Sequence, residues 1–316
     1  MDNDSAKKQS YLYGPVPSRR LGLSLGVDIV PAKVCTLDCI YCQLGRTTDK
    51  TVQREAFVPL DAVLHELSEK LARGLKADFI TISGSGEPTL NAQFGELIDG
   101  IRQMTRIPVA LITNGTLLYR EDVRRDSSKA DVVLPSLDAG DEQTFQRINR
   151  PHTSISIEKL VLGLCRFREE FDGQIWLEVF FVDRINTDAQ QIANIKKLID
   201  RIRPDKIQLN TAVRPTAEPG LRKLDADRLQ QIAAQFGERC EVIADFAAAR
   251  LGKHIENKAE SVLSMLKRRP CSLDDICSSL GMHRNDAIKY VTHFQQRGLV
   301  NSEQRGGIVF FKVRSR

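Results

Sequence analysis

The chain has 316 residues, enough for one large domain or for a large and a small one. Hydrophobic residues make up 41% and charged residues 28% of the sequence, which is ordinary for a globular protein. No apolar run approaches the roughly 20 residues of a membrane-spanning helix, and the first residues lack the apolar core of a signal peptide. We therefore expect a cytoplasmic protein with no membrane partner.

Apolar segments rich in β-branched residues alternate with amphipathic helical patterns over most of the chain. Because these segments are almost continuously apolar, they are typical of parallel strands buried on both faces. About six such repeats predict an α/β fold, either an open doubly wound sheet or a barrel, with its chemistry at the carboxyl ends of the strands. The predicted strands are 25–30, 79–83, 109–113, 132–137, 175–182 and 206–212, and helices between them include 60–75, 94–104, 157–171 and 188–202.

Three of the seven cysteines lie within eight residues, directly after the first predicted strand. Cys35, Cys39 and Cys42 can supply soft thiolates to three irons of a cubane cluster, which leaves the fourth iron open to a ligand outside the protein. The alternative is zinc, but structural zinc sites usually pair two separated knuckles, and this sequence has one. The scattered cysteines are expected to be buried small hydrophobic residues; they are Cys165, Cys240, Cys271 and Cys277.

This CxxxCxxC pattern, with Tyr41 just before the last cysteine, resembles the signature of the radical S-adenosylmethionine (SAM) superfamily. The likeness extends over residues 11–250 and implies a partial (β/α)6 TIM-like barrel. It implies a [4Fe-4S] cluster on the three cysteines and SAM bound to the open iron through its amino and carboxylate groups. Reductive cleavage of SAM would give a 5′-deoxyadenosyl radical that abstracts hydrogen from a substrate, with a flavodoxin or ferredoxin as the electron donor.

Further segments resemble motifs of that superfamily in the right order. Residues 83–88, at the end of the second strand, resemble its GGEP motif, with Ser85-Gly86 where many members have two glycines. Residues 113–115 resemble its TNG element, and two polar residues end the fourth strand. Glu178 and Asn210 on later strands either face the same cavity or are satisfied polar groups of the core. The resemblance implies that SAM is bound by Ser85, Gly86, Glu87, Asn114, Ser136 and Asp138.

Two segments narrow the resemblance within the superfamily. Residues 138–151 are similar to the branch that contains the tRNA wyosine-forming enzymes, and the opening YGPVPSRRLG (13–22) resembles an uncharacterised subgroup near it. The wyosine enzymes carry further N-terminal cysteines for a second cluster, whereas this chain has none before Cys35. Arg19 and Arg20 either bind the SAM carboxylate or a substrate phosphate, or form a solvated pair beside a strand.

The sequence changes character near residues 247–256. Residues 253–316 contain 12 basic and six acidic residues, whereas the rest of the chain has 34 and 35. We expect a helix at 257–268, a second helix from Ser272 to Gly281 with Asp275 completing a capping box, and a third at 284–296. Strands at 299–301 and 308–313 flank Gly306-Gly307. This order resembles a winged helix-turn-helix domain, predicted over residues 253–316.

The basic tail leaves three roles open: binding of nucleic acid, binding of a peptide or protein, and a purely structural role. The segment 283–293 mixes basic, amide and aromatic residues like a recognition helix, and 304–307 would be the tip of the wing. Ile288, Val291 and Phe294 are expected to belong to the core. The leading hypothesis is a radical SAM enzyme that acts on a macromolecule, with RNA as the leading candidate substrate. The alternatives are a peptide- or protein-modifying radical enzyme and an iron-sulfur redox regulator that binds DNA.

Overall fold

The computed structural model describes residues 10–18, 20–212, 216–218, 220–244, 258–280, 282, 287, 290–291, 293–295, 297–306 and 308–314. Within these residues the main element is an eight-stranded sheet with the order β1-β2-β5-β6-β7-β8-β9-β10. Strand β1 is antiparallel to β2, and all other neighbours are parallel. The predicted α/β class is therefore confirmed as a mixed, mostly parallel sheet.

The six predicted strands are all present, and two edge strands were not predicted. The strand predicted at 132–137 is shorter than expected, because Pro135 follows Leu134 and has no N–H for a ladder bond. The strands of the sheet are β1 Leu12–Ser18, β2 Gly22–Val27, β5 Phe79–Ile82, β6 Val109–Ile112, β7 Val132–Leu134, β8 Gln174–Phe181, β9 Lys206–Thr211 and β10 Cys240–Val242. A separate ladder joins β3 Val34–Cys35 to β4 Asp49–Lys50.

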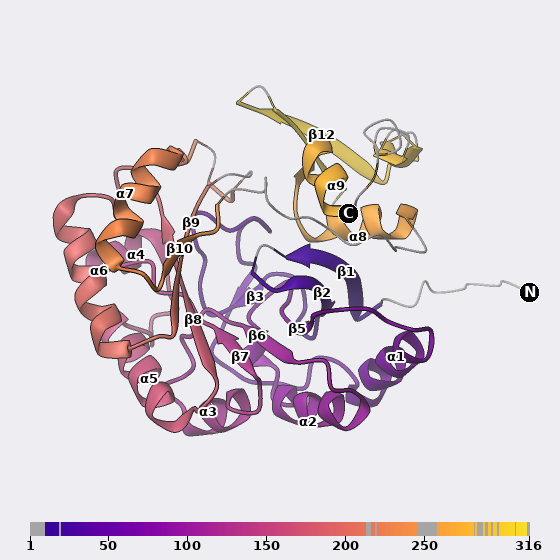
Figure 1. Ribbon diagram of the computed structural model, residues 1–316, viewed down its shortest axis with the longest axis horizontal. Coiled ribbons are helices and arrows are strands. Elements are labelled where there is room, and N and C mark those ends of the chain that lie inside the picture. Colours follow the sequence, from indigo (N-terminus) through magenta and orange to yellow (C-terminus); the bar gives the residue numbers. More distant parts are fainter. Residues whose placement is uncertain are drawn as a thin grey trace, which may run out of the picture.

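The helices form an outer layer around the strands, as Figure 1 shows. Several start at a side-chain cap predicted by general rules, such as Asp141, Ser156 and Asp188, each of which accepts a backbone N–H three residues on. Their apolar faces pack on the sheet. These helices are α1 Leu60–Ala72, α2 Phe94–Met104, α3 Glu121–Ser127, α4 Glu142–Asn149, α5 Ile157–Glu170, α6 Ala189–Ile202 and α7 Ala226–Phe236. None of them is long and apolar enough to cross a membrane, nor is any other described helix.

The last described residues, 258–314, form a smaller unit with its own core, here called the C-terminal unit. It contains α8 Lys258–Arg268, α9 Leu273–Leu280 and a three-stranded sheet in the order β11-β13-β12. The strands are β11 Cys271–Ser272, β12 Val300–Arg305 and β13 Ile308–Val313. Figure 1 shows this unit beside β1, and α8 and α9 both pack against that strand.

The predicted capping box at the start of α9 is confirmed. Ser272 Oγ accepts the Asp275 N–H at 3.1 Å, and Asp275 Oδ2 accepts the Ser272 N–H at 2.9 Å. Val291 and Phe294 are buried in the core of the unit, as predicted. Ile288, Gly281, the domain boundary at 247–256 and most of the predicted third helix lie outside the described residues.

Candidate functional site

The three clustered cysteines lie on one loop at the carboxyl edge of the sheet. Cys35 ends β3, and the Cys42 N–H donates to the Cys39 carbonyl at 3.1 Å. The loop is tied to the end of α4 because the Ile40 N–H donates to the Ile148 carbonyl at 2.9 Å. All three thiols are free and half-buried. The structure thus brings the three predicted ligands together on a well-anchored turn, here called the cysteine loop (35–42).

Each cysteine sulfur receives one N–H donor from a side chain outside the CxxxCxxC pattern. Asn114 Nδ2 lies 3.6 Å from Cys35 Sγ, and Asn149 Nδ2 lies 3.4 Å from Cys39 Sγ. Lys33 Nζ lies 3.4 Å from Cys42 Sγ. These donors favour thiolates, the form that binds a metal.

Burial opposes the thiolate form in the free protein. It raises the pKa of Cys35 to about 12, with the nearby Glu87 carboxylate adding to the effect. Burial also raises the pKa of Cys39 well above its usual value, and the charge of Asp138 adds to it. Protons must therefore leave when a metal group binds, and the three N–H donors offset part of that cost.

The Glu87 carboxylate joins the two predicted SAM-binding motifs. Glu87 is 2% exposed, and its Oε1 accepts the Thr89 N–H at 3.1 Å, the Thr89 hydroxyl at 2.6 Å and the Thr113 hydroxyl at 2.5 Å. Its Oε2 accepts the Asn114 N–H at 2.8 Å. Burial raises the pKa of Glu87, although four hydrogen bonds favour its charged form. The ends of β5 and β6 are thereby fixed to each other.

The loop 83–88 packs directly against the strand that carries Cys35. The Glu87 N–H donates to the Val34 carbonyl at 3.0 Å, and the Lys33 N–H donates to the Ser85 carbonyl at 2.7 Å. A Cβ on Gly86 would lie 2.0 Å from the Val34 carbonyl oxygen, so only glycine fits there. The structure therefore places Ser85, Gly86 and Glu87 next to the cysteine loop.

Asp138 lies in a buried network on the other side of the cysteine loop. Its Oδ2 accepts the Tyr41 hydroxyl at 2.5 Å and Asn149 Nδ2 at 2.7 Å, and its Oδ1 accepts the Phe180 N–H at 2.9 Å. Burial raises the pKa of Asp138 to about 6. Tyr41 also stacks on Phe180 with ring centroids 3.9 Å apart. Asp138 therefore fixes the aromatic residue before Cys42 and the donor to Cys39. Ser136 is half-buried and forms an isolated β-bridge with Glu178.

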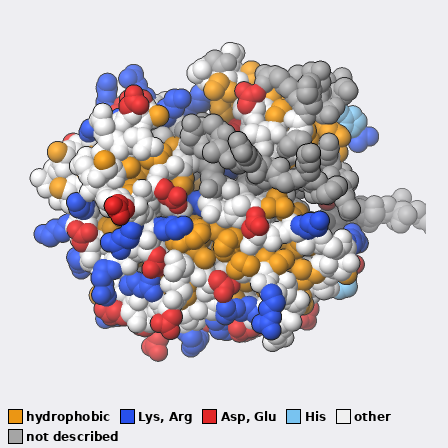
Figure 2. Space-filling model, in the orientation of Figure 1, with side chains coloured by type: hydrophobic (Ala, Val, Ile, Leu, Met, Phe, Trp, Pro, Cys, Tyr) orange, Lys and Arg blue, Asp and Glu red, His pale blue; other side chains and the backbone are white. Residues whose placement is uncertain are grey.

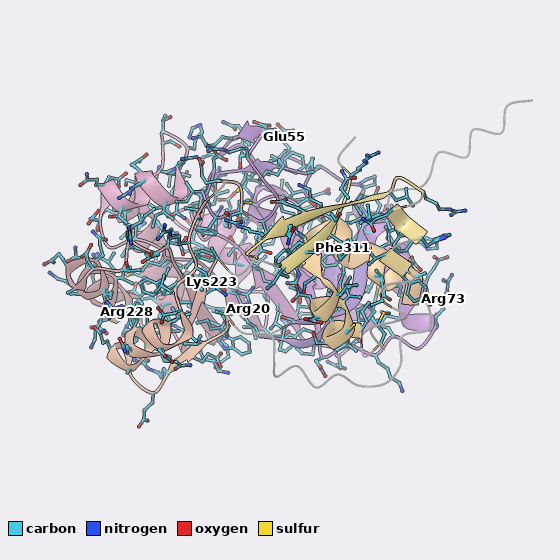
Figure 3. The ribbon with its side chains drawn as sticks, turned by 90° about the horizontal axis from the view of Figure 1, so that it is seen from above. Arg20, Glu55, Arg73, Lys223, Arg228 and Phe311 are labelled. Atoms are coloured by element: carbon cyan, nitrogen blue, oxygen red, sulfur yellow. The ribbon has the colours of Figure 1, made fainter. Side chains whose placement is uncertain are left out.

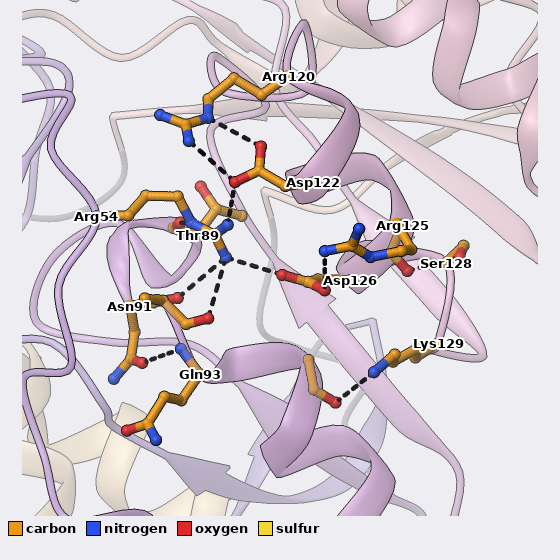
Figure 4. Close-up of polar contacts among 12 residues, drawn as sticks. Arg54, Thr89, Asn91, Gln93, Arg120, Asp122, Arg125, Asp126, Ser128 and Lys129 are labelled. Atoms are coloured by element: carbon orange, nitrogen blue, oxygen red, sulfur yellow. Dashed lines mark hydrogen bonds and ion pairs between the residues drawn. The ribbon is translucent and has the colours of Figure 1, made fainter.

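Arg54 supports the turn that follows Glu87 (Figure 4). Its side chain is 8% exposed and forms ion pairs with Asp122 at 2.6 Å and Asp126 at 2.9 Å. Its Nε donates to the Thr89 carbonyl at 3.0 Å. One buried guanidinium therefore joins α3 to the turn between the 83–88 loop and α2.

A cavity of about 240 Å³ lies between the inner face of the sheet, the segment that directly follows the cysteine loop, and α8. Gln43 and Leu44, directly after the last cysteine, line it together with Asn210. Arg20, labelled in Figure 3, also lines it and forms an ion pair with Glu178, which accepts Asn210 Nδ2 at 2.8 Å. The sequence did not decide whether Glu178 and Asn210 face the cavity. Asn210 does line it, and Glu178 is the hydrogen-bond partner of Asn210. Arg19 lies outside the described residues.

Three thiols on one loop are the soft ligands that an iron-sulfur cluster takes. In the described part of the chain, no three Cys, His, Asp or Glu side chains form a group that could hold a single metal ion. Asn149 Oδ1, beside Cys39, is buried and has no hydrogen-bond partner among the described residues. An unpaired buried acceptor is expected where a donor that is not part of the chain, such as the amino group of a bound molecule, completes the site.

Sequence reasoning missed several residues of this site. Lys33 and Asn149 come from outside the cysteine pattern, although Asn149 lies in the segment 138–151 that resembled the wyosine branch. Lys33 has φ +67°, a left-handed conformation that is uncommon for a residue with a Cβ. That conformation was the only signal of a special role, and it is not visible in the sequence.

Comparisons with known proteins agree with this geometry. Residues 29–182 match the model of the Radical SAM superfamily. A "UPF0026 protein" of Methanocaldococcus jannaschii is 31% identical over 96% of this chain and 97% of its own length. A protein of Brachyspira hyodysenteriae named GTPase Obg is 36% identical over 98% of this chain, which spans only 46% of that protein.

Solved structures share the fold at low sequence identity. Streptococcus suis SuiB bound to S-adenosylmethionine has a TM-score of 0.53 at 15% identity, over 71% of this chain and 51% of SuiB. A radical SAM methyltransferase from Sphaerobacter thermophilus has a TM-score of 0.52 at 15% identity, over 69% of this chain and 66% of that one.

Proposed function

The chain belongs to the UPF0026 family and to the radical SAM superfamily. From this premise we propose that it is a radical SAM enzyme that acts on a macromolecule, with RNA as the leading candidate substrate. Its cofactors are a [4Fe-4S] cluster and SAM. The observation that carries the proposal is that the cysteine loop lies against the 83–88 loop and Asn114, which the Glu87 carboxylate joins to each other. A cavity lies beside the segment that follows the cysteine loop. A cluster used only as a redox sensor needs no such arrangement, which argues against the DNA-binding regulator.

Cys35, Cys39 and Cys42 would hold three irons of the cluster. The 83–88 loop and Asn114 would hold SAM, because Glu87 fixes them to each other beside Cys35, with Ser136 and Asp138 on the neighbouring strand end. When bound, the two cofactors supply reductive cleavage of SAM to a 5′-deoxyadenosyl radical that abstracts hydrogen from the substrate.

The residues of the chain itself prepare this chemistry. Asn114, Asn149 and Lys33 donate hydrogen bonds to the three ligand sulfurs and so help to set the reduction potential. Asp138 holds Tyr41 and Asn149 in place. The electron donor would be a small redox protein such as a flavodoxin or ferredoxin.

Two finer structural assignments belong to the proposal. The six parallel strands from β2 to β9, each neighbouring the next in the sheet, would correspond to a partial (β/α)6 barrel. The C-terminal unit would be a winged helix-turn-helix in which β12 and β13 form the wing. The tip of that wing contacts the barrel, because Arg305 donates to the Leu221 carbonyl at 3.1 Å.

RNA is the favoured substrate class because of the charge of the C-terminal residues. On the face shown in Figure 2, Lys and Arg side chains over the helical layer are interspersed with Asp and Glu, whereas residues 253–316 have twice as many basic as acidic residues. A macromolecule guided by that surface would reach the cavity along α8, which forms one of its walls. The competing substrate class is a peptide or protein.

The first experiment is anaerobic reconstitution with iron and sulfide, followed by SAM, dithionite and quantification of 5′-deoxyadenosine. The wild-type protein is expected to produce it, and the Cys39→Ala variant is not, because one iron loses its thiolate. A reconstituted cluster with no SAM cleavage, with or without added RNA, would contradict the proposal.

Binding of RNA is tested separately by its dependence on salt. If Lys and Arg of the C-terminal unit contact phosphates, the affinity falls steeply between 50 and 200 mM salt, roughly tenfold or more for a few contacts. An affinity that does not change with salt, together with binding of peptides, would favour the peptide-modifying alternative.

A further inference from the structure

We propose that Arg268, at the end of α8, is a positioning residue for the 83–88 loop, and that it couples docking of the C-terminal unit to SAM binding. This inference rests on the proposed assignment of that loop to SAM. It concerns a contact between two parts of the protein that lie 240 residues apart in the sequence.

Arg268 reaches out of the C-terminal unit and makes four contacts with the barrel. Its Nη1 donates to Asp28 Oδ2 at 2.7 Å and to the Ser85 hydroxyl at 3.3 Å. Its Nη2 donates to the Tyr13 hydroxyl at 3.0 Å, and the guanidinium lies 3.9 Å from the centroid of the Tyr13 ring. The Arg268 and Asp28 side chains are 18% and 21% exposed, so the pair is largely shielded from solvent. A planar guanidinium is suited to such a fork of contacts, and the ammonium of lysine is not.

Asp28 passes this contact on to the backbone of the 83–88 loop. While its Oδ2 accepts Arg268, it also accepts the Ser85 hydroxyl at 2.6 Å, and its Oδ1 accepts the Ser85 N–H at 3.0 Å. One carboxylate is therefore shared between the C-terminal unit and the loop. Arg268 supplies one of the three hydrogen bonds that the Asp28 carboxylate accepts here, and the only one of the three that comes from a cation. Displacing Arg268 would remove that bond and change how Asp28 holds Ser85.

The loop has little freedom to absorb such a change. A Cβ on Gly84 would lie 2.6 Å from Asp28 Oδ1, and one on Gly86 would lie 2.0 Å from the Val34 carbonyl oxygen. Both glycines are thus in close contact with neighbouring groups, on the Asp28 side and on the cysteine-loop side. A movement at Asp28 is therefore transmitted through Ser85 toward Glu87 and Cys35, since close-packed contacts pass on strain.

Tyr13 gives a role to the opening YGPVPSRRLG segment, which the SAM chemistry alone does not explain. Its ring lies over Gly26 of β2, where an added Cβ would come within 1.8 Å of a ring atom. Its hydroxyl is 2.5 Å from the Ser83 hydroxyl, at the start of the same loop. The ring is thereby held between Gly26 on one side and the Arg268 guanidinium, with which it makes a cation–π contact.

Coupling of this kind is reciprocal. If Arg268 stabilises the loop conformation that binds SAM, bound SAM must stabilise the docked C-terminal unit by the same free energy. The protein thus has a way to sense at the C-terminal unit whether SAM is present, and to sense at the SAM site whether the unit is docked.

The test uses the full-length protein, reconstituted anaerobically, with SAM and no reductant, so that binding is measured without turnover. Equilibrium dialysis is expected to show that Arg268→Ala weakens SAM binding by about fivefold or more, the lower end of typical coupling between sites. Arg268→Lys keeps the charge but loses the fork, and its affinity should fall between the two. Lys267→Ala, at the exposed neighbouring position of α8, is the matched control and should bind SAM like the wild type.

The second readout is the rate of hydrogen exchange of the α8 backbone amides. If Arg268 were needed only for folding, this rate would not depend on SAM. SAM should slow this exchange in the wild type and in Lys267→Ala, but not in Arg268→Ala. Equal SAM affinity in Arg268→Ala and wild type, or exchange in α8 that does not respond to SAM, would overturn the coupling alone. A wild-type protein that carries its cluster but does not bind SAM would overturn the assignment of the loop, and the coupling with it.

Discussion

Replacing Arg54 by methionine should strongly destabilise the part of the protein built on the eight-stranded sheet. The Arg54 side chain is 8% exposed, and its partners Asp126 and Asp122 are 12% and 33% exposed. Methionine fills a similar volume and keeps the packing on the Phe94 ring, which the guanidinium now covers at 5.4 Å. The loss then comes from the two carboxylates, and breaking a buried pair from one side costs about 3–5 kcal/mol. Asp122 retains Arg120 as a partner at 2.9 Å, whereas Asp126 retains the longer contact with the exposed Arg125 at 3.7 Å, so Asp126 carries most of that cost.

The assay follows from the single tryptophan of the chain. Trp176 lies in β8, so its fluorescence during urea unfolding reports on the eight-stranded sheet rather than on the C-terminal unit. Arg54→Met should lower the free energy of unfolding by about 3–5 kcal/mol. Adding Asp126→Asn to Arg54→Met removes the negative charge that has lost its main partner. The double variant should regain at least about 1 kcal/mol of the free energy of unfolding. Arg73→Met, at an exposed position at the end of α1, is the matched control and should be neutral. A loss below about 1 kcal/mol, or a double variant less stable than Arg54→Met alone, would refute this reasoning.

Three further predictions concern the loops around the site. Asn149→Leu removes the donor to Cys39 and should lower the reduction potential of the cluster by about 40 mV, equivalent to about 1 kcal/mol for one electron, in an EPR-monitored titration. Gln143→Leu, at an exposed amide on the same helix, is its control, and an unchanged potential in Asn149→Leu would contradict the assignment. Gly86→Ala should weaken SAM binding by more than about tenfold in equilibrium dialysis, because its Cβ would displace the Val34 carbonyl; near-normal affinity would show that β3 can move. Hydrogen bonds from Arg120 and then Arg54 lower the pKa of Asp122 to about 2, so its stabilising contribution is present above its unfolded pKa near 4 and is lost as the pH falls toward 2. Asp122→Asn should lack that part of the acid dependence of unfolding, and identical acid profiles would contradict it.

The sequence predicted those structural features that depend on a local pattern of residues. Continuous apolar runs identified the six inner strands, and spacing alone located the cysteine loop and the capping box of Ser272 and Asp275. Strand β1 was missed because Gly14, Pro15 and Pro17 disfavour a strand in any local reading, whereas pairing with β2 imposes one.

Long-range contacts were beyond the reach of sequence reasoning. Nothing near Arg268 indicates that it meets Asp28, and nothing near Asn149 indicates a sulfur. Asp138 was expected in the SAM shell, and the structure shows its carboxylate bound to Tyr41, Asn149 and Phe180. The strand pattern places these residues at the carboxyl ends of neighbouring strands, but which side chain bonds to which depends on loop paths that no periodicity encodes.

The position of β1 also has a consequence for the order in which the protein matures. The ribosome synthesises this strand about 240 residues before α8 and α9, the helices that cover it. Until then Val16, which packs against the core of the C-terminal unit, faces water at an outer strand of the sheet. An outer strand that waits for a distant cover invites pairing with other chains. Nascent or truncated chains that end before α8 should therefore aggregate, and their dependence on chaperones should end once the C-terminal unit has emerged.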